Sequence, residues 1–484
     1  MAKRKQKKNK SKNLRGKKLL ALGWPSGPVI GAAQRAAAKF AQAGLTEENK
    51  LLERLEAVRQ HPTVWATDPI LGPVAQEWLR LVEREKANAE LPQLREAPIE
   101  IASWGRHLLD HGTLEQMEQA ARLPIARAAA VMPDGHVGYG LPIGGVLAVE
   151  NAVIPYGVGV DIACRMRLSV FDCKPQILEK KTRKFERALL NQTRFGMGIG
   201  WEPSERPEHE VLDDPAWNQL PLLNQLKNKA WSQLGSSGGG NHFVEFGTLI
   251  LQEDAPDMGL QAGSYLALLS HSGSRGFGAK IANAYTKIAR ELHPKLPKKV
   301  KHLAWLDFEQ AEGQEYWLAM NLAGRYASAN HAIIHQRVAQ AARLDCIATV
   351  ENHHNFAWEE TLADGTPVIV HRKGATPAGK GVLGIIPGSM ADPGYVVRGK
   401  GNALSINSAS HGAGRRLSRR EAFKKVDPKL WNKYLKDNHV TLFGGSLDES
   451  PQAYKSIDKV MSAQQDLVEV VARFEPRLVR MADG

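Results

Sequence analysis

Cysteine is scarce in this chain, and long uncharged apolar runs are missing. Three cysteines among 484 residues (Cys164, Cys173 and Cys346) are too few for a disulfide framework, so the sequence indicates a reducing compartment. No uncharged apolar run reaches the roughly 18 residues that a membrane-spanning helix needs. The apolar patch from Leu19 to Trp24 is too short to suggest secretion. We therefore expect a cytoplasmic protein that does not contact a membrane.

Acidic residues are absent from the first 18 positions, which contain ten lysines and arginines. This segment carries most of the formal net charge of +13 at pH 7. It has no apolar periodicity, so residues 1–18 are predicted to be a disordered basic tail. Such a tail adds sequence-independent affinity for phosphate backbones, although a tail that only aids solubility fits the composition equally well.

The rest of the chain divides by composition into two regions. Residues 19–120 are predicted to be a helical N-terminal region, because apolar residues such as Leu52, Leu55 and Val58 recur at helical spacing. Residues 121–484 mix glycine-rich loops, short strands and helices without regular alternation, which predicts an α+β body of mixed sheets and flanking helices. The expected strands are 146–149, 167–171, 242–246 and 367–371, and the expected later helices are 279–292, 311–345, 417–437 and 451–474.

Metal-ligand residue types concentrate in five loops, most of which are rich in glycine. They are Asp161 and Cys164 in YGVGVDIACRMR, His242 in GSSGGGNHF, His271 in HSGSRG, His353 and His354 in ENHHNF, and His411 in SHGAGR. A carboxylate and a thiolate within one turn, joined by neutral imidazoles, suit manganese, zinc or iron better than magnesium. Composition alone also allows Cys164 to be a small buried hydrophobe and His242 to be an ordinary strand histidine. The surrounding glycines favour the metal site, because backbone there can approach a ligand closely.

Phosphate chemistry is the second theme of these loops. The run GSSGGGN (235–241) has the composition of an anion-binding nest, and Arg275 adds a planar donor for phosphate oxygens. A flexible linker has a similar composition, but a linker would not lead directly into a hydrophobic strand. We therefore prefer the phosphate interpretation.

Three familiar motifs are incomplete or out of context. GATPAGKG (374–381) nearly matches a phosphate-binding P-loop but ends in Gly381 where serine or threonine is required. His331 and His335 have zinc-protease spacing, yet Ala332 occupies the position of the general-base glutamate, so both histidines are expected to be structural. The G-x-S-x-G pattern occurs as GSSGG (235–239), but this run leads into the strand expected at 242–246 and does not connect a strand to a helix, so it does not indicate a nucleophile elbow. These departures argue against a P-loop enzyme, a zinc protease and an elbow-type hydrolase.

Eight motifs occur in a fixed order between about residue 120 and residue 484: MPDGHVGYGLPIGG, GVGVDIACRMRL, GGGNHFVEFG, HSGSRG, HHN, HRKGAT, PGSM and SHGAGRRLSR. Together they resemble the RtcB family of RNA-splicing ligases. The resemblance implies the family's own α+β fold with a deep, metal-containing cleft. It also implies an enzyme of tRNA splicing or RNA repair that uses GTP and two manganese ions. Its substrates would be an RNA 3′-phosphate or 2′,3′-cyclic phosphate end and a 5′-hydroxyl end.

The resemblance assigns a role to each matching residue. His411 would be the nucleophile that attacks the α-phosphorus of GTP, expels pyrophosphate and holds GMP as a phosphoramidate. The expected metal ligands are Cys164, bridging both ions, Asp161 and His242 on one ion, and His271 and His354 on the other. His353 would not be a ligand.

The resemblance also implies a nucleotide site. Asn241 would touch the α-phosphate, Glu245 would accept hydrogen bonds from guanine, and Tyr454 would pack against the base. Arg275 and Arg415 are candidates for phosphate or RNA-end contacts. The full expected set is Asn241, His242, Phe243, Val244, Glu245, His354, Asn355, Pro387, Gly388, Ser389, Met390, Gly412, Ala413, Gly414 and Tyr454.

The chain departs from the family pattern in ways that suggest a divergent branch. The family segment GGVGxDINCGVR is here YGVGVDIACRMR, so Tyr156, Ala163 and Arg165 stand where the family has other residues. Pro377 follows HRKGAT where the family usually has arginine. The family's near-terminal lysine, which contacts guanine, is missing, and Arg480 is the candidate to replace it.

Two other functions stay open at this point. One is a guanylyltransferase that caps 3′-phosphate ends of RNA or DNA without sealing them. The other is an inactive RNA-binding paralogue built on the same scaffold. The sequence leaves open the oligomeric state and the need for an activating protein.

Overall fold

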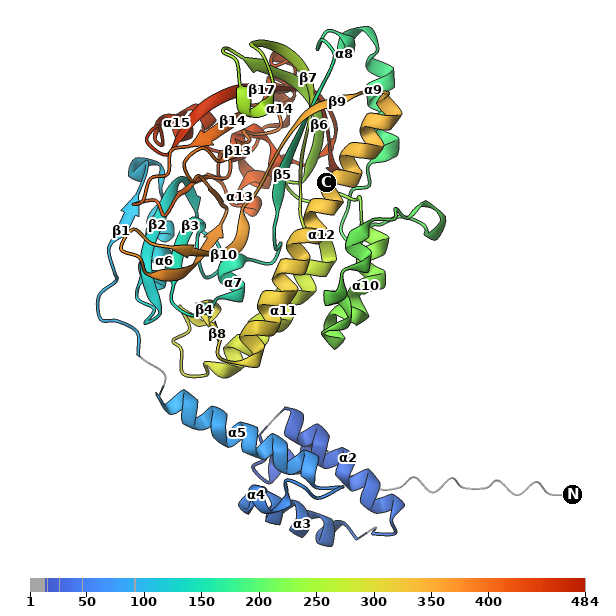
Figure 1. The fold of residues 1–484 in the computed structure, drawn as a ribbon, viewed down its shortest axis with the longest axis vertical. Helices are drawn as coiled ribbons and strands as arrows, with labels where there is room; N and C mark the ends of the chain where they lie inside the picture. Colours follow the sequence, from blue (N-terminus) through green and yellow to red (C-terminus); the bar gives the residue numbers. More distant parts are fainter. Residues whose placement is uncertain (1–13, 15, 26, 46, 91–92, 484) are drawn as a thin grey trace, which may run out of the picture. The chain divides into compact units, whose positions relative to one another are not determined.

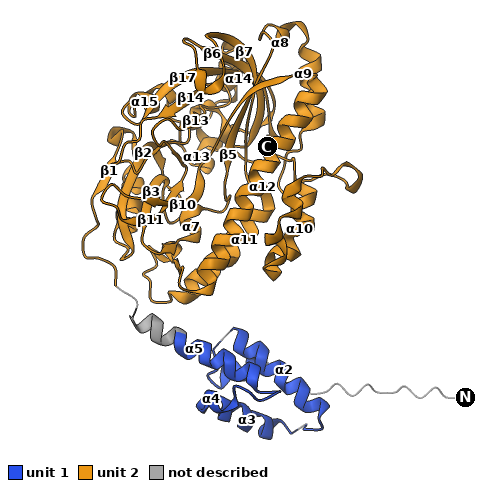
Figure 2. Ribbon diagram, in the orientation of Figure 1, with its two compact units in different colours: residues 1–92 blue, residues 93–484 orange. Residues whose placement is uncertain are grey.

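The computed structural model describes the chain except for residues 1–13, 15, 26, 46, 91–92 and 484 (Figure 1). It consists of two compact units, residues 1–92 and 93–484 (Figure 2). Most of the predicted basic tail lies outside the described residues. Its last part begins a helix, α1 (Gly16–Ala21), and Leu14 is buried, so the prediction of disorder through residue 18 is wrong at that end.

The first unit is helical, as the apolar spacing predicts. Its elements are α1, α2 (Pro28–Gln42), α3 (Glu48–Gln60), α4 (Pro62–Trp65) and α5 (Gly72–Glu90). Proline opens both α2 and α4, because its missing N–H is not needed in the first turn of a helix. Leu55, Val58 and Val74 are fully buried and give the unit its own hydrophobic core.

The second unit begins earlier than the predicted boundary between residues 120 and 121. Strand β1 (Ile101–Ser103) pairs in parallel with β2 (Ala126–His136), and α6 (His111–Ala121) lies between them in the chain. Asp110 caps α6 by accepting a hydrogen bond from the Thr113 N–H at 2.8 Å. Because β1 and β2 share one sheet, residues 93–120 belong with the larger unit, and a three-residue strand is too short to show a sequence period.

The larger unit contains two large sheets and two two-stranded ones, which pair β4 (Ala152–Val153) with β8 (Leu306–Asp307) and β12 (Ala375–Pro377) with β15 (Ser408–Ser410). A five-stranded sheet has the order β1-β2-β3-β11-β10. Its remaining members are β3 (Ile143–Val149), β11 (Pro367–Lys373) and β10 (Asn355–Thr361). The predicted strands at 146–149 and 367–371 lie within β3 and β11 and are confirmed.

The other sheet, of eight strands, has the order β13-β14-β17-β6-β7-β5-β9, with β16 paired to β17. The strands are β5 (Arg165–Phe171), β6 (Phe243–Leu251), β7 (Gly263–Ser272), β9 (Cys346–His353), β13 (Leu383–Ile386), β14 (Gly394–Gly399), β16 (Thr441–Gly445) and β17 (Val468–Asp483). Helices α9 (Thr182–Gln192), α11 (Arg275–Leu292) and α12 (Ala311–Ala342) run beside this sheet in Figure 1, and α9 and α12 contribute to a core shared with β5 to β7. The α+β expectation is thus confirmed.

One predicted helix, residues 451–474, is wrong. Only Ile457–Ser462 forms an α-helix there (α15), and Val468 begins β17. Residues 472–478 read apolar and charged in alternation, and Ala472, Phe474 and Leu478 are buried. This strand pairs with both β14 and β6, so tertiary pairing decides its conformation.

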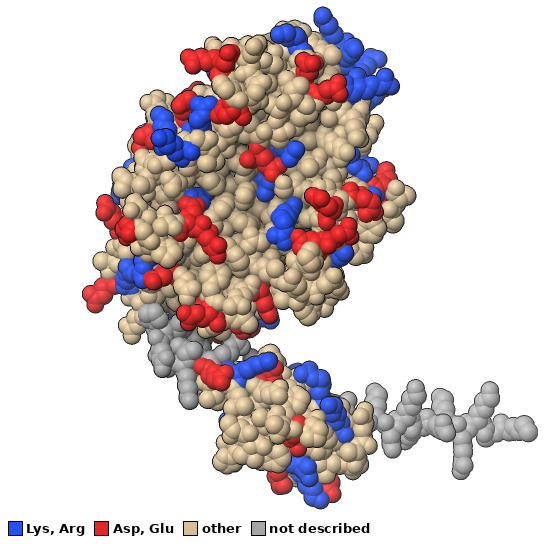
Figure 3. Space-filling view, viewed as in Figure 1, with Lys and Arg blue, Asp and Glu red and all other residues tan. Residues whose placement is uncertain are grey.

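Charge is unevenly spread over the face shown in Figure 3. Lysines and arginines gather over α8 (Ile177–Lys180) and α9, whereas both signs are interspersed over much of the remaining surface. Among the described residues, no helix combines the length and apolarity that crossing a bilayer requires.

Phe246 should be a main contributor to the stability of the larger unit. Its ring is fully buried, 5.1 Å from the Phe185 ring and 6.5 Å from the Phe171 ring, measured between centroids. Replacement by alanine is expected to lower the free energy of unfolding by about 3–5 kcal/mol, because it removes this packing and leaves a cavity. Urea denaturation followed by tryptophan fluorescence measures the change. Phe423→Ala, at a position that is 56% exposed, is the control, and equal effects of the two changes would contradict the packing argument.

Candidate metal centre and nucleotide pocket

Four neighbouring strands bring the predicted metal ligands together. Cys164 directly precedes β5, His242 directly precedes β6, His271 lies in β7 and His354 directly follows β9. Because β6, β7, β5 and β9 are adjacent and antiparallel, these strand ends meet at one edge of the sheet. Asp161 joins them from the turn after α7 (Pro155–Val158).

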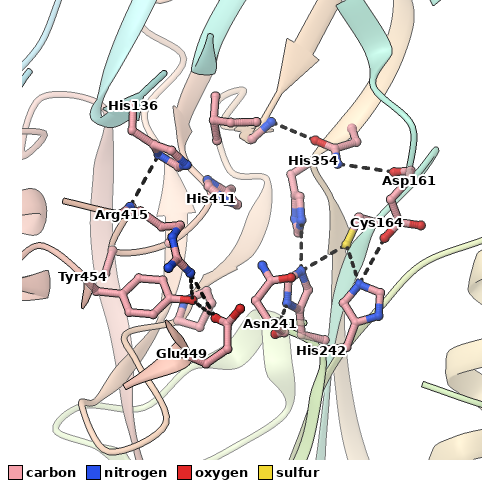
Figure 4. Close-up of a pocket in the computed structure, with 18 of the residues that line it drawn as sticks. His136, Asp161, Cys164, Asn241, His242, His354, His411, Arg415, Glu449 and Tyr454 are labelled. Atoms are coloured by element: carbon pink, nitrogen blue, oxygen red, sulfur yellow. Dashed lines mark hydrogen bonds and ion pairs between the residues drawn. The ribbon is translucent and has the colours of Figure 1, made fainter. Parts of the chain in front are cut away.

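The ligand atoms form two groups of three that share the thiol (Figure 4). Cys164 Sγ lies 3.1 Å from His271 Nε2 and 3.6 Å from His242 Nε2. His242 Nε2 is 3.0 Å from Asp161 Oδ2, and His271 Nε2 is 3.2 Å from His354 Nε2. Within each group the ligand atoms lie within 4.8 Å of one another. The structure thus brings together all five residues that the sequence analysis named as metal ligands.

The hydrogen bonds around this cluster point lone pairs into it. The Nδ1–H of His242 donates to the Ser237 carbonyl at 2.5 Å, and that of His271 donates to the Asn241 carbonyl at 3.0 Å. Burial lowers the pKa of His271 to about 3, so its ring is neutral. Its Nε2 therefore presents a lone pair 3.1 Å from Cys164 Sγ and 3.2 Å from His354 Nε2. Sulfur and imidazole nitrogen atoms that converge at this spacing, with the Asp161 carboxylate beside them, fit a bound metal.

His353, the neighbour of His354, lies outside both donor groups. Its ring packs 5.0 Å from the rings of Phe356 and Trp358, measured between centroids. The two consecutive histidines therefore project into different surroundings, one toward the cluster and one into an aromatic contact.

His411 lies beside the cluster and is held by an aspartate. It follows β15 (Ser408–Ser410), and its ring centroid is 4.9 Å from that of His354. The fully buried Asp134, near the end of β2, places Oδ2 2.6 Å from His411 Nδ1 and accepts the His411 backbone N–H at 3.1 Å. Nδ1–H thus donates to the carboxylate, and Nε2 keeps a free lone pair.

The electrostatics of this pair favour an ionised aspartate. Burial acts to raise the pKa of Asp134, but the charge of His411 and the hydrogen bond from it outweigh burial and hold the pKa below its usual value. Gly414 makes this close packing possible. It has a φ of +72°, and a Cβ there would lie 2.0 Å from the Asp134 carbonyl oxygen.

If His411 is the nucleophile that the family resemblance implies, Asp134→Asn should slow its reaction while leaving the imidazole in place. The amide loses the negative charge, and its NH₂ group can reverse the tautomer, so that Nε2 carries the proton. We expect the rate of covalent labelling by GTP to fall by about a hundredfold or more. Single-turnover kinetics with radiolabelled GTP measure the rate. The control is Asp466→Asn, at an exposed site that does not line the pocket. If Asp134→Asn is labelled as fast as the unaltered chain, Asp134 does not have this role.

The predicted nucleotide loops surround a pocket of about 420 Å³ next to the cluster. The predicted residues that line it are Asn241, His242, Phe243, His354, Asn355, Pro387, Gly388, Ser389, Met390, Gly412, Ala413, Gly414, Arg415 and Tyr454. His411 and the ligands Asp161, Cys164 and His271 line the same pocket. Loops from both sheets therefore converge on one cavity.

Three predicted residues lie outside the described lining of this pocket. Val244 packs in the core between the sheet and α12. Glu245 shares the strand face of Phe243, and its buried Oε2 has no hydrogen-bond partner among the described residues. The Arg275 guanidinium donates to Ser236 Oγ at 3.1 Å and to the Gly196 carbonyl at 3.3 Å, so in this structure it supports the glycine-rich loop.

Arg480 is also directed elsewhere. It forms an ion pair with Asp483 at 3.0 Å, and its guanidinium lies over the Phe195 ring. Met481, the next residue, lines the pocket instead. The expectation that Arg480 replaces the family's lysine therefore finds no support in this geometry.

The pocket wall includes charged residues that the sequence analysis did not name. Glu449 is 2% exposed and ties together Arg415, Arg419 and the Tyr454 hydroxyl (Figure 4). Glu449 lies between the FGGS segment and Tyr454, and a single acidic residue there gives no sequence signal for this role. Asp134, in contrast, stands in the motif MPDGHVGYG and could have been selected as a titratable residue there.

The altered residues beside Cys164 have local explanations. Arg165 is buried and forms an ion pair with Glu351, which also binds Arg167 at 2.6 Å, so its added charge is neutralised away from the pocket. Ala163 has a φ of +55°, a conformation that favours glycine or asparagine, and its N–H donates to the Asn355 carbonyl at 2.7 Å.

His331 and His335 pack inside the protein on α12. Ser270 Oγ lies 2.7 Å from His331 Nδ1 and 2.8 Å from His335 Nε2, and Ser169 Oγ lies 2.8 Å from His335 Nδ1. These contacts agree with the structural role predicted for both. The segment 374–381 contains β12 (Ala375–Pro377) and opens no helix, in keeping with the rejected P-loop.

Comparisons with known proteins agree with this geometry. A family profile described as "tRNA-splicing ligase RtcB" matches residues 116–216 and 205–482. A "tRNA-splicing ligase RtcB" of Thermococcus kodakarensis is 32% identical over 440 residues, covering 75% of this chain and 90% of that protein. An "RNA-splicing ligase RtcB" of Escherichia coli K12 is 31% identical over 420 residues, covering 79% of this chain and 97% of that protein.

A third relative extends the comparison to another bacterial group. The "RNA-splicing ligase RtcB" of Mycobacterium tuberculosis is 30% identical over 430 residues, covering 75% of this chain and 98% of that protein. The profile match covers most of the larger unit, and that unit holds the two donor groups, Asp134 and His411. The chain therefore belongs to the RtcB family of tRNA-splicing ligases.

Proposed function

We propose that this protein is a GTP- and manganese-dependent RNA ligase. It joins an RNA 3′-phosphate or 2′,3′-cyclic phosphate end to a 5′-hydroxyl end through a histidine-GMP intermediate, in tRNA splicing or RNA repair. One observation carries the proposal: a free imidazole nitrogen, His411 Nε2, belongs to a ring 4.9 Å from that of His354 in a cluster of five metal-ligand side chains. Membership of a family whose relatives are named RNA-splicing ligases supports the substrate.

The ligand cluster fits two divalent cations that share Cys164. Asp161 and His242 would complete one site, and His271 and His354 the other. When bound, the cations would withdraw electron density from the triphosphate and neutralise charge that develops on it. The mixed oxygen, nitrogen and sulfur set accepts manganese, and zinc is its strongest competitor.

The covalent step belongs to His411. Its Nε2 attacks the α-phosphorus of GTP, an N–P bond forms, and the bond to the β-phosphate oxygen breaks, so that pyrophosphate leaves. Asp134 keeps the Nδ1 proton in place and stabilises the positive charge that the ring acquires. His411 Nε2 is therefore already unprotonated, and no separate base has to remove a proton from it before it attacks.

Glu245 supports guanine as the base. Burial raises its pKa well above the usual value, and Oε2 has no hydrogen-bond partner among the described residues. The N1–H and amino group of guanine can donate two parallel hydrogen bonds to the ionised carboxylate, which would satisfy both oxygens and favour the charged form that burial disfavours. Adenine presents an acceptor at N1 and cannot. Tyr454, in the pocket wall, would pack against the base.

The remaining steps act on RNA. A cyclic phosphate is first hydrolysed to a 3′-phosphate. That phosphate then attacks the GMP phosphorus and releases His411, which creates an activated pyrophosphate linkage. The 5′-hydroxyl of the second strand attacks the RNA phosphorus, GMP leaves, and a phosphodiester forms. GTP is needed because an unactivated phosphomonoester lacks a good leaving group.

A ligation assay tests the proposal. The purified chain is mixed with a 3′-phosphate RNA, a 5′-hydroxyl RNA, GTP and Mn²⁺, and the products are separated on a denaturing gel. We expect a joined product that depends on GTP and is lost in His411→Ala. Accumulation of a 3′-guanylylated strand without joining would favour the guanylyltransferase alternative. Absence of both products and of covalent labelling would favour the inactive paralogue.

A further inference from the structure

A second hollow of about 450 Å³ lies next to the nucleotide pocket. Its walls come from α7, from the C-terminal half of α11 and from η6 (Lys301–Leu303). Tyr156 and His302 line one part of it, and Lys287, Arg290 and Lys301 line another. It is open to solvent, so a chain-like ligand can cross it.

An aromatic ledge connects this hollow to the nucleotide pocket. Tyr139 lines the nucleotide pocket and is 70% exposed. Its ring lies 6.5 Å from Tyr156 and 6.1 Å from His302, and those two rings are 5.0 Å apart, measured between centroids. Lys373 Nζ lies 5.0 Å from the centre of the Tyr156 ring and also belongs to the nucleotide pocket. The ledge is thus continuous from one cavity to the other.

The far side of the hollow is strongly basic. Residues 287–301 contain six lysines and arginines and one acid, Glu291. Lys287, Lys295, Lys298 and Lys301 are exposed. Arg290 donates to the His302 ring, which holds that ring in place on the ledge. This density of positive charge beside the exposed Tyr139 ring and the half-buried rings of Tyr156 and His302 is the composition of a site for single-stranded nucleic acid, where phosphates meet cations and bases stack on aromatic faces.

The position of the ledge leaves it free for a polynucleotide. If the guanylate lies between His411 and the wall formed by Ser389, Met390 and Tyr454, then its base does not occupy Tyr139. The RNA whose end reacts must leave the pocket by another side, and the ledge provides an exit toward the basic segment. This step rests on the proposed function.

We propose that Tyr139, Tyr156 and His302, together with Lys287, Arg290 and Lys301, bind unpaired nucleotides of an RNA strand next to its reacting end. The rings stack on bases, and the cations contact the backbone. Recognition is therefore independent of sequence and selects single strands over duplexes, whose bases are already stacked.

Binding of short RNAs measures this groove directly. Fluorescence anisotropy is recorded with two unstructured 12-nucleotide RNAs, one with a 3′-phosphate and one with a 5′-hydroxyl, so that each type of end is tested separately. Tyr139→Ala is expected to weaken binding of at least one RNA about fivefold or more, which is the lower range for loss of one stacked base. The joint change Lys287→Glu and Lys301→Glu is expected to weaken it about tenfold or more and to reduce its salt dependence.

The control has the same charge change on another basic surface. Lys180→Glu with Arg183→Glu alters the patch over α8 and α9, which lies at the opposite end of the larger unit from β8 (Leu306–Asp307) in Figure 1. We expect this control to bind within about twofold of the unaltered chain. Equal losses in control and groove variants, unchanged binding in the groove variants, or competition by polyglutamate as strong as by RNA would each overturn the proposal.

Covalent labelling by GTP separates this inference from the proposed function. The joint lysine change is expected to leave labelling without RNA unchanged, because both lysines line the second hollow and not the nucleotide pocket. An unaltered chain that is not labelled, combined with RNA binding that the groove variants lose, would refute the ligase chemistry and retain the groove.

Discussion

His411→Ala is expected to abolish covalent labelling of the chain by radiolabelled GTP. In the structure, His411 places its ring beside His354 with Nδ1 bound to Asp134, so Nε2 is the nitrogen free to attack phosphorus. Alanine removes that imidazole, so no side-chain nitrogen at this position can form a bond to GMP. Labelling in the presence of Mn²⁺, followed by denaturing electrophoresis, should fall to background.

The control for this change is His107→Ala, at an exposed histidine outside the pocket lining. It should keep full labelling. The bond formed with histidine is a phosphoramidate, so the label on the unaltered chain should be lost in acid and kept in alkali. Labelling that persists in His411→Ala would show that another residue is the nucleophile and would contradict the proposed mechanism.

Cys164→Ala is expected to disrupt both halves of the metal centre at once. Its Sγ is the one atom shared by the two donor groups, whereas each other ligand belongs to a single group. Loss of the thiol leaves two ligands in each group. Metal analysis after gel filtration in Mn²⁺ should therefore show about two ions per unaltered chain and far fewer in the variant.

Thermal unfolding gives an independent reading of the same change. At a hundredfold excess over the dissociation constant, a metal that binds only the folded state adds about 2.7 kcal/mol of stability. Mn²⁺ should raise the melting temperature of the unaltered chain and of Cys346→Ser, whose cysteine is exposed and outside the cluster. Cys164→Ala should show little rise; a full rise would mean that the metal binds elsewhere.

The metal ligands could be predicted from sequence because each stands in a short loop with a distinctive composition. Asp161 and Cys164 share one loop, and His271 stands in HSGSRG. What the sequence does not show is why they meet. That requires the strand order β6-β7-β5-β9, in which residues separated by more than a hundred positions become neighbours at one sheet edge.

Other features depend on tertiary contacts with no local signal. The Arg275 loop looks like a phosphate site, but Gly238, at a φ of +98°, lets the guanidinium pack against the glycine-rich backbone, where a Cβ would lie 1.8 Å from Arg275 Nη1. Glu449 gains its role only because Arg415 and Arg419 converge on it. In β17, residues that the sequence analysis expected to be helical form a strand, because β14 pairs with one of its edges and β6 with the other.

Anomalous diffraction near the manganese absorption edge, from crystals grown with Mn²⁺, tests the central claim most directly. Two peaks are predicted, both within about 2.5 Å of Cys164 Sγ. One should also contact Asp161 and His242, and the other His271 and His354. Peaks bound at other residues, or no peak in this cluster at saturating Mn²⁺, would contradict the account.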